Sequence, residues 1–187
     1  MIKRQTFPTL EYLHECFAID ENSPSGLVWR ERPQSHFRRE RERNLTNTQY
    51  AGKFVGSFKT NRWSVVLQRR NIAVSRIVYM LHHNIEEIPN GLIVDHKDRD
   101  PSNNKISNLR LATHQQNMSN KTPHSKTGYP YIKMIRRRNR IVYYLNAPRK
   151  SKEKSATFET LEDAKDLSKK ISIELHGEFS PYHNGLK

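Results

Sequence analysis

Cysteine is nearly absent from this sequence, and its scarcity excludes two kinds of structural support. The chain has 187 residues and a single cysteine, Cys16. One cysteine excludes an intrachain disulfide and a structural zinc site built from several cysteines. Cys16 falls in an apolar pattern with Leu10, Leu13 and Phe17. That spacing predicts a short helix, beginning near Thr9, with a buried thiol.

Long apolar runs are also missing. Apolar residues make up 34% of the chain, and no stretch approaches the roughly 20 apolar residues that a membrane-spanning helix needs. The amino-terminal segment MIKRQTFPTLEYL lacks the apolar stretch of a secretory signal. We therefore expect no membrane contact and a cytoplasmic location, in the host cell if the gene belongs to a phage.

Basic residues clearly outnumber acidic residues in this sequence. Lysine and arginine number 33 against 19 aspartates and glutamates, which gives a formal net charge of +14. Such an excess repels itself in a compact chain, and the phosphates of a nucleic acid compensate it by counterion release. The charge alone does not separate DNA from RNA, so an RNA-associated protein stays open as an alternative.

Short periodic segments predict an α+β fold. The strands expected in the first two thirds of the chain are 27–29, 54–58, 63–67 and 71–74, with a helix at 76–83 packed on them. The polar segment 35–49, SHFRRERERNLTNTQ, shows little periodicity and is expected to be a loop or basic arm. Strands at 131–137, 141–147 and 155–158, followed by a helix over 160–176 capped by Thr160, predict a three-stranded antiparallel sheet crossed by one helix.

One segment carries residues suited to phosphodiester hydrolysis: VDHKDRDPSNNKISNLRLATHQQN, residues 94–117. A neutral imidazole such as that of His96 takes a proton from water near neutral pH. Carboxylate and amide oxygens, here from Asp95 and Asn117, are ligands that Mg²⁺ prefers. Strand-like runs at 92–95 and 109–111, with a helix capped by Thr113, would bring both ends of the segment together. Because neighbouring strand residues face opposite sides, Asp95 and His96 share a site only where the strand twists or ends.

This segment resembles the ββα-metal module of the HNH nucleases, particularly the phage and intron-associated homing type. The family pattern of a DH pair, an NN turn, an NLR run and a helix with Asn or His is similar to Asp95-His96, Asn103-Asn104, Asn108-Leu109-Arg110 and Asn117.

The resemblance implies roles for individual residues. His96 is the expected general base, and Asp95 and Asn117 are the expected ligands of a single Mg²⁺ or Mn²⁺, without structural zinc. Asn108 is expected to hold the loop and orient His96. Arg110 is a candidate phosphate contact.

The last third resembles the DNA-binding domain of plant ethylene-response factors (AP2-like), which lays its sheet on the major groove. The residues expected on the DNA-facing strands are Lys133, Arg136, Arg138, Arg140 and Tyr144. This sequence lacks the tryptophan of the second strand and carries Pro130 early in the first, so a sheet that contacts only phosphates stays open.

Together these patterns predict four regions. They are an N-terminal helix and strand region with a basic arm (1–50), the nuclease module with its preceding strands (51–121), a linker (122–128) and the AP2-like domain (129–187). The expected protein is a monomeric, metal-dependent endonuclease of the homing type that nicks or cuts double-stranded DNA and uses no small-molecule cofactor. The alternative is a DNA-binding regulator with an inactive HNH module.

Overall fold

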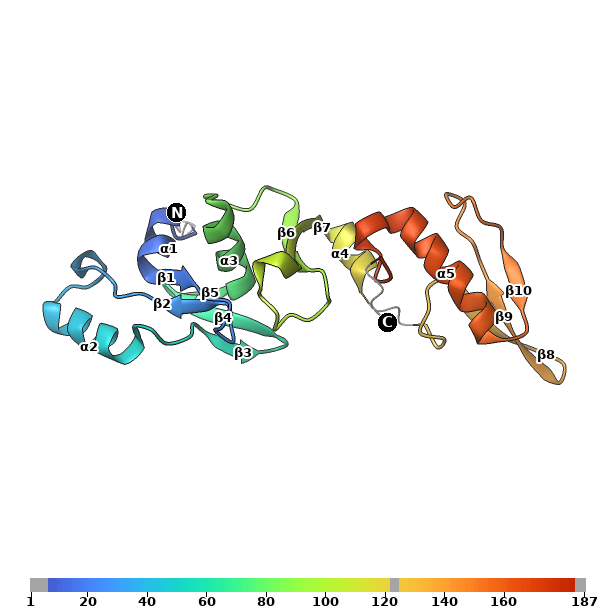
Figure 1. Ribbon diagram of the computed structural model, residues 1–187, viewed down its shortest axis with the longest axis horizontal. Coiled ribbons are helices and arrows are strands. Elements are labelled where there is room, and N and C mark those ends of the chain that lie inside the picture. Colours follow the sequence, from blue (N-terminus) through green and yellow to red (C-terminus); the bar gives the residue numbers. More distant parts are fainter. Residues whose placement is uncertain (1–6, 122–124, 184–187) are drawn as a thin grey trace, which may run out of the picture. The chain divides into compact units, whose positions relative to one another are not determined.

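The protein divides into two compact units, which are described separately. The computed structural model describes residues 7–121 and 125–183. The first unit comprises Met1–Ala112 and the second Thr113–Lys187. Small antiparallel sheets combined with helices confirm the predicted α+β class (Figure 1). Residues 122–124 of the predicted linker lie outside the described residues.

The first unit is built from short elements joined by tight turns. Its helices are α1 (Leu10–Cys16), α2 (Glu40–Tyr50) and α3 (Val74–His83), with 3-10 turns η1 (Gln34–His36) and η2 (Ile106–Asn108). Its strands form three groups. Strand β1 (Phe17–Ile19) pairs antiparallel with β2 (Leu27–Trp29), and β3 (Ser57–Lys59), β4 (Arg62–Leu67) and β5 (Arg70–Ala73) form an antiparallel sheet with β4 central. Strand β6 (Leu92–His96) pairs with β7 (Leu109–Thr113).

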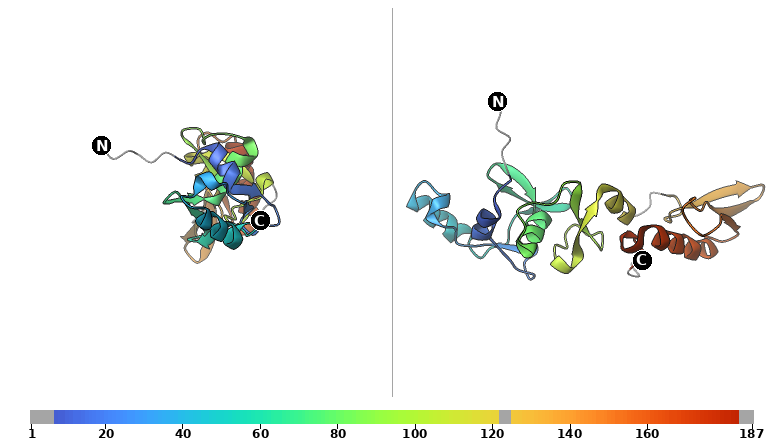
Figure 2. Two further views of the ribbon diagram at one scale, coloured as in Figure 1. Left: turned by 90° about the vertical axis from the view of Figure 1, so that its left-hand side faces the viewer. Right: turned by 90° about the horizontal axis from the view of Figure 1, so that it is seen from above.

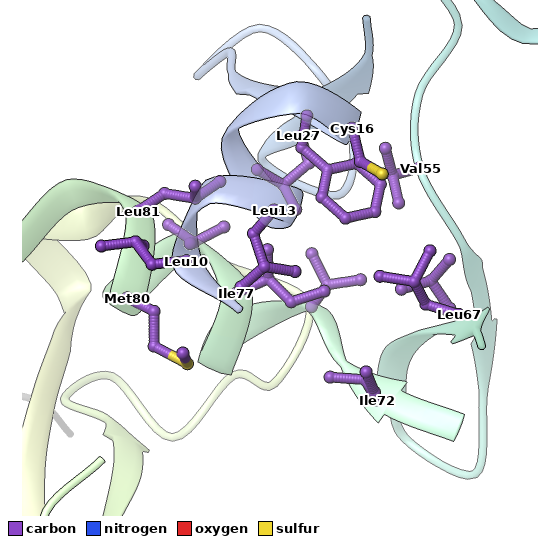
Figure 3. Close-up of a cluster of buried hydrophobic side chains, with 14 of the residues drawn as sticks. Leu10, Leu13, Cys16, Leu27, Val55, Leu67, Ile72, Ile77, Met80 and Leu81 are labelled. Atoms are coloured by element: carbon purple, nitrogen blue, oxygen red, sulfur yellow. The ribbon is translucent and has the colours of Figure 1, made fainter. Parts of the chain in front are cut away.

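The core of the first unit draws on segments far apart in the sequence. Helix α1 lies beside α3, and α3 packs on β4 and β5 (Figure 2). The buried cluster labelled in Figure 3 includes Leu10, Leu13, Cys16, Leu27, Val55, Leu67, Ile72, Ile77, Met80 and Leu81. Fully burying an aliphatic side chain of this size contributes about 1.5–3 kcal/mol. The amino-terminal helix and the strand sheet therefore stabilise each other through one shared core.

Cys16 is fully buried in this cluster, as the sequence predicts. Burial raises the pKa of its thiol to about 11. The Cys16 side chain therefore stays a protonated thiol near neutral pH and acts as a small apolar residue.

One glycine is required by close backbone packing at the start of the strand sheet. Gly56 has a φ of +85°, and a Cβ there would lie 2.6 Å from the carbonyl oxygen of Ser64. Any side chain would force β3 away from β4, so this position needs glycine.

The prediction of a loop or basic arm at 35–49 was wrong over most of its length, because α2 occupies Glu40–Tyr50. No residue of α2 is buried, so the helix has no apolar stripe that a periodicity search could find. Local support comes from an ion pair between Arg43 and Glu40. Asn47 adds a tertiary anchor, because its amide accepts from the backbone N–H of Arg32 and donates to the Arg32 carbonyl, each at 3.0 Å.

The second unit matches the predicted sheet with one helix across it. It contains α4 (His114–Asn120), β8 (Ile132–Arg137), β9 (Arg140–Leu145), β10 (Ala156–Phe158), α5 (Leu161–His176) and the 3-10 turn η3 (Gly177–Phe179). The strands are antiparallel in the order β10-β9-β8, and α5 packs on β9 and β10 (Figures 1 and 2). As predicted, Thr160 caps α5 and accepts from the backbone N–H of Asp163.

No described helix in either unit is both long enough and apolar enough to cross a bilayer.

Candidate active site

The predicted catalytic pair lies at the end of a strand. Strand β6 ends at His96, directly after Asp95. Asp95 is buried, with 5% of its surface exposed, whereas His96 is half-buried. Because His96 is the last residue of β6, the regular alternation of side chains between the two faces of the strand stops at this pair.

Asp95 forms a buried ion pair with the neighbouring strand. Arg110 in β7 donates from Nε to Asp95 Oδ2 at 3.0 Å, and its side chain is only 9% exposed. Arg110, the candidate phosphate contact, is thus buried with its Nε against a protein carboxylate, and its contact with phosphate stays a prediction. An ionised carboxylate accepts several bonds through its two oxygens, so the pair is compatible with Asp95 also binding a cation.

Asn108 ties the long loop after β6 to the start of β7. Its side-chain oxygen accepts from the backbone N–H of Asp98 at 3.0 Å. Its amide donates to Asp98 Oδ1 at 2.9 Å and to the Asn103 carbonyl at 2.8 Å. Asn103 in turn donates to Asp98 Oδ2 at 2.7 Å. Buried polar groups need such partners, and here they give an irregular loop a defined shape.

The described side-chain partner of His96 is a residue to which the sequence assigned no role. His96 Nε2 lies 3.0 Å from Oδ1 of Asn104, which is 4% exposed. Asn104 donates through Nδ2 to the carbonyl of Ser25 at 2.9 Å. Asn108 bonds within the loop, and its expected effect on the orientation of His96 stays a prediction, whereas Asn104 contacts the His96 ring directly. The Asn103-Asn104 turn was a visible signal, but the bond to Ser25, 79 residues away, was not.

The predicted second ligand, Asn117, lies in α4 of the second unit. Thr113 caps this helix by accepting from the Gln116 backbone, and the Gln116 side chain accepts from the Thr113 backbone N–H. This reciprocal cap confirms the predicted start of the helix and places Asn117 in its first turn or so. Asp95 and His96 lie in the first unit, so the structure does not test whether Asn117 shares a cation with them.

Candidate metal ligands in this region are oxygen atoms. No three histidine, cysteine, aspartate or glutamate side chains within 7–121 and 125–183 come together in a way that would hold a metal ion. A site of one carboxylate and one amide, completed by water, suits Mg²⁺, which keeps several waters and prefers oxygen ligands. The chemistry of Asp95 and Asn117 therefore fits the predicted Mg²⁺ or Mn²⁺.

The predicted DNA-contacting residues of the second unit divide between two faces of its sheet. Residues paired across two strands lie on the same face of the sheet, and along one strand every second residue lies on that face. The register pairs Lys133 with Tyr144 and Arg137 with Arg140, which places all four on one face. The opposite face, which includes Ile132, Tyr143, Leu145 and Phe158, packs on α5. By the same alternation Arg136 belongs to the α5 side, and Arg138 lies in the turn with a φ of +50°.

Comparison with known proteins identifies one part of the chain. Residues 73–119 match the family model described as HNH endonuclease. No curated protein and no solved structure gives a significant match to the chain. The match covers β6, β7 and α4 with the preceding helix α3, which is the segment that holds Asp95, His96, Asn108 and Asn117. Residues 73–119 are therefore similar to an HNH endonuclease domain.

Proposed function

We propose that this protein is a metal-dependent DNA endonuclease of the homing type, in which His96 is the general base. The observation that carries the proposal is the position of His96: it ends β6 inside the segment matched by the HNH family, and a buried amide holds its ring. A half-buried imidazole in a defined orientation is suited to taking a proton from a water molecule that attacks phosphorus.

Asp95 and Asn117 are the proposed ligands of one Mg²⁺ or Mn²⁺. A divalent ion, when bound, supplies positive charge that stabilises the scissile phosphate and the departing oxygen. Arg110 holds the Asp95 carboxylate through its Nε, which limits the positions that the ligand oxygens can take. Asn108 keeps the 97–108 loop folded through its bonds to Asp98 and to the Asn103 carbonyl.

The second unit is proposed to bind double-stranded DNA and so to tether the protein to its substrate. The sheet face that does not pack on α5 presents Lys133, Arg137 and Arg140 as exposed cations beside the half-buried Tyr144. Two-stranded and three-stranded sheets fit the major groove, and arginine recognises both phosphate and guanine. Arg140 also pairs with the exposed Glu159 at 2.8 Å, a contact that water and salt weaken readily.

Cleavage of supercoiled plasmid DNA tests the proposed function. We expect cutting or nicking with Mg²⁺ or Mn²⁺ and none with EDTA. His96→Ala should slow cleavage by at least about 100-fold, the low end of what a general base contributes, while DNA binding stays near normal.

The matched control is His82→Ala, since His82 is an exposed histidine in the last turn of α3. This control should cleave like the wild type. Retained cleavage by His96→Ala would contradict the assigned role of the imidazole. Tight DNA binding without cleavage in any divalent ion would instead support the alternative, a DNA-binding regulator with an inactive HNH module. Preferential competition by RNA would support an RNA-associated protein.

A further inference from the structure

A polar chain connects the proposed catalytic histidine to the loop between β1 and β2. The Ser25 carbonyl accepts from Asn104 Nδ2 at 2.9 Å, and Asn104 Oδ1 lies 3.0 Å from His96 Nε2. Ser25 is fully buried, and Asn104 is 4% exposed. The three residues belong to the same compact unit although the sequence separates Ser25 from the pair by more than half of that unit.

The chemistry of this chain decides which imidazole nitrogen carries the proton. A backbone carbonyl only accepts hydrogen bonds, so the Asn104 amide must point its NH₂ group at Ser25. Its oxygen then faces His96, and an amide oxygen also only accepts. His96 Nε2 must therefore donate. In the neutral ring this leaves the lone pair on Nδ1, the nitrogen able to take a proton from water.

The loop that supplies the carbonyl is itself closely braced. Ser23 and Ser25 both donate through Oγ to the Leu27 carbonyl, at 2.8 and 3.2 Å. The backbone N–H of Gly26 bonds to the Ser23 carbonyl at 3.0 Å, and Leu27 is fully buried in the core. The Ser25 carbonyl is thus a fixed acceptor, because moving it would break bonds within the loop and shift a core residue.

Packing at Gly26 indicates that Asn104 is closely fitted to this loop. A Cβ at Gly26 would lie 3.2 Å from the Asn104 Cβ and 3.3 Å from the Asn104 carbonyl oxygen. Gly26 also has a φ of +81°, which glycine adopts without strain. The absence of a side chain lets the loop approach Asn104 closely enough for the hydrogen bond to Ser25.

We propose that the β1–β2 loop is a positioning element of the nuclease site, acting through Asn104 on the ring orientation and tautomer of His96. Asn104 is a positioning residue and Nδ1 of His96 is the proton-accepting atom. This inference rests on the proposed function of His96 as general base. It assigns to the N-terminal region a part in catalysis that lies outside the matched segment 73–119.

Single-turnover cleavage by Asn104→Ala tests the positioning role. Loss of a residue that orients a reactive side chain typically costs about 10–100-fold, so we expect a slower rate constant of that size with unchanged DNA affinity. The matched control is Asn22→Ala, because Asn22 is an exposed asparagine in the β1–β2 loop, whereas Asn104 is buried. The rate for each variant is compared after its thermal unfolding midpoint shows that it is folded at the assay temperature.

A second measurement reads the tautomer without requiring cleavage. The ¹⁵N chemical shifts of the His96 ring in the metal-free wild type should report a proton on Nε2, and Asn104→Ala should give a mixture of tautomers. A neutral ring protonated on Nδ1 in the wild type, or an unchanged rate and tautomer in Asn104→Ala, would overturn the inference. If the wild type cleaves no DNA, the proposed function fails, and the ¹⁵N shifts still decide whether Asn104 sets the tautomer.

Discussion

Among the residues that the structure describes, the buried charged side chains are those of Asp95 and Arg110, which form a pair. Their side chains are 5% and 9% exposed, and they meet at 3.0 Å. Removing one partner of a buried pair is strongly destabilising because the other charge stays buried. The same pair holds one proposed metal ligand, so a variant at either residue tests stability and the proposed function together.

Replacing Arg110 tests the energetic weight of this pair. Arg110→Met should lower the free energy of unfolding by about 3–5 kcal/mol, because it leaves the Asp95 carboxylate without this partner. Urea denaturation followed by circular dichroism measures the change. Arg43→Met, which removes an exposed ion pair with Glu40, should cost less than about 1 kcal/mol. Similar losses in the two variants would mean that the Asp95–Arg110 pair behaves like a surface contact.

Residue types and spacing selected the candidate residues, whereas the contacts between them depend on the tertiary structure. Asp95 and His96 could be selected because a carboxylate and an imidazole end an apolar run inside a recognisable motif. Asn104 could not be assigned its contact with His96, because that contact depends on a carbonyl from Ser25 that only folding brings near. The burial of Arg110 was equally invisible, since an arginine in a basic chain predicts an exposed cation.

Among the elements, those with an apolar stripe were predicted well and those without one were not. Helices α3 and α5 and strands β8 and β9 lie close to their expected positions, because burial of one face produces the periodic pattern. Helix α2 buries nothing and depends on an ion pair and on the Asn47 contacts with Arg32. Such a helix leaves no periodic signal in the sequence.

The histidine at the end of α5 predicts that the stability of the second unit depends on pH. His176 is the last residue of α5, and its Nε2 lies 2.9 Å from the hydroxyl of Tyr131. Burial lowers the pKa of His176 below its ordinary value of 6.5 and raises that of Tyr131, which favours a tyrosine hydroxyl donating to a neutral ring. The unfolded chain then binds the proton more tightly than the folded one, so stability falls as pH drops below about 6.5.

Thermal unfolding of the full chain between pH 7 and pH 5 checks this dependence by calorimetry. His176→Gln should remove part of the wild-type loss of stability on acidification. His114→Gln, which changes an exposed histidine of the same unit, should keep the wild-type pH profile. Identical profiles for the wild type and His176→Gln would show that the ring of His176 protonates equally well in the folded and unfolded chain.

At the scale of the whole molecule, the first unit joins the predicted N-terminal region and the strands of the predicted nuclease module in one core. Residues from Leu10 to Leu109 contribute to it. Periodicity indicates that a segment has an apolar face, but it does not indicate which other face covers it. This is why the sequence predicted most elements, whereas the contact between the β1–β2 loop and the matched segment 73–119 was found only in the structure.

The net charge of +14 predicts that binding of the proposed DNA substrate by the whole molecule depends on salt, and the second unit offers a defined set of cations to test. Replacing Lys133, Arg137 and Arg140 by serine should weaken DNA binding and lower the slope of log affinity against log salt by about 0.9 for each phosphate that the variant no longer neutralises. Cleavage at saturating protein should be unchanged, because these residues lie outside the matched segment 73–119. Replacing Arg149, Lys150 and Lys152, which are exposed in the β9–β10 loop, removes the same charge elsewhere. If both triple variants reduce the slope equally, the unit attracts DNA by its total charge, whereas a larger effect of the sheet variant would place the duplex on that face.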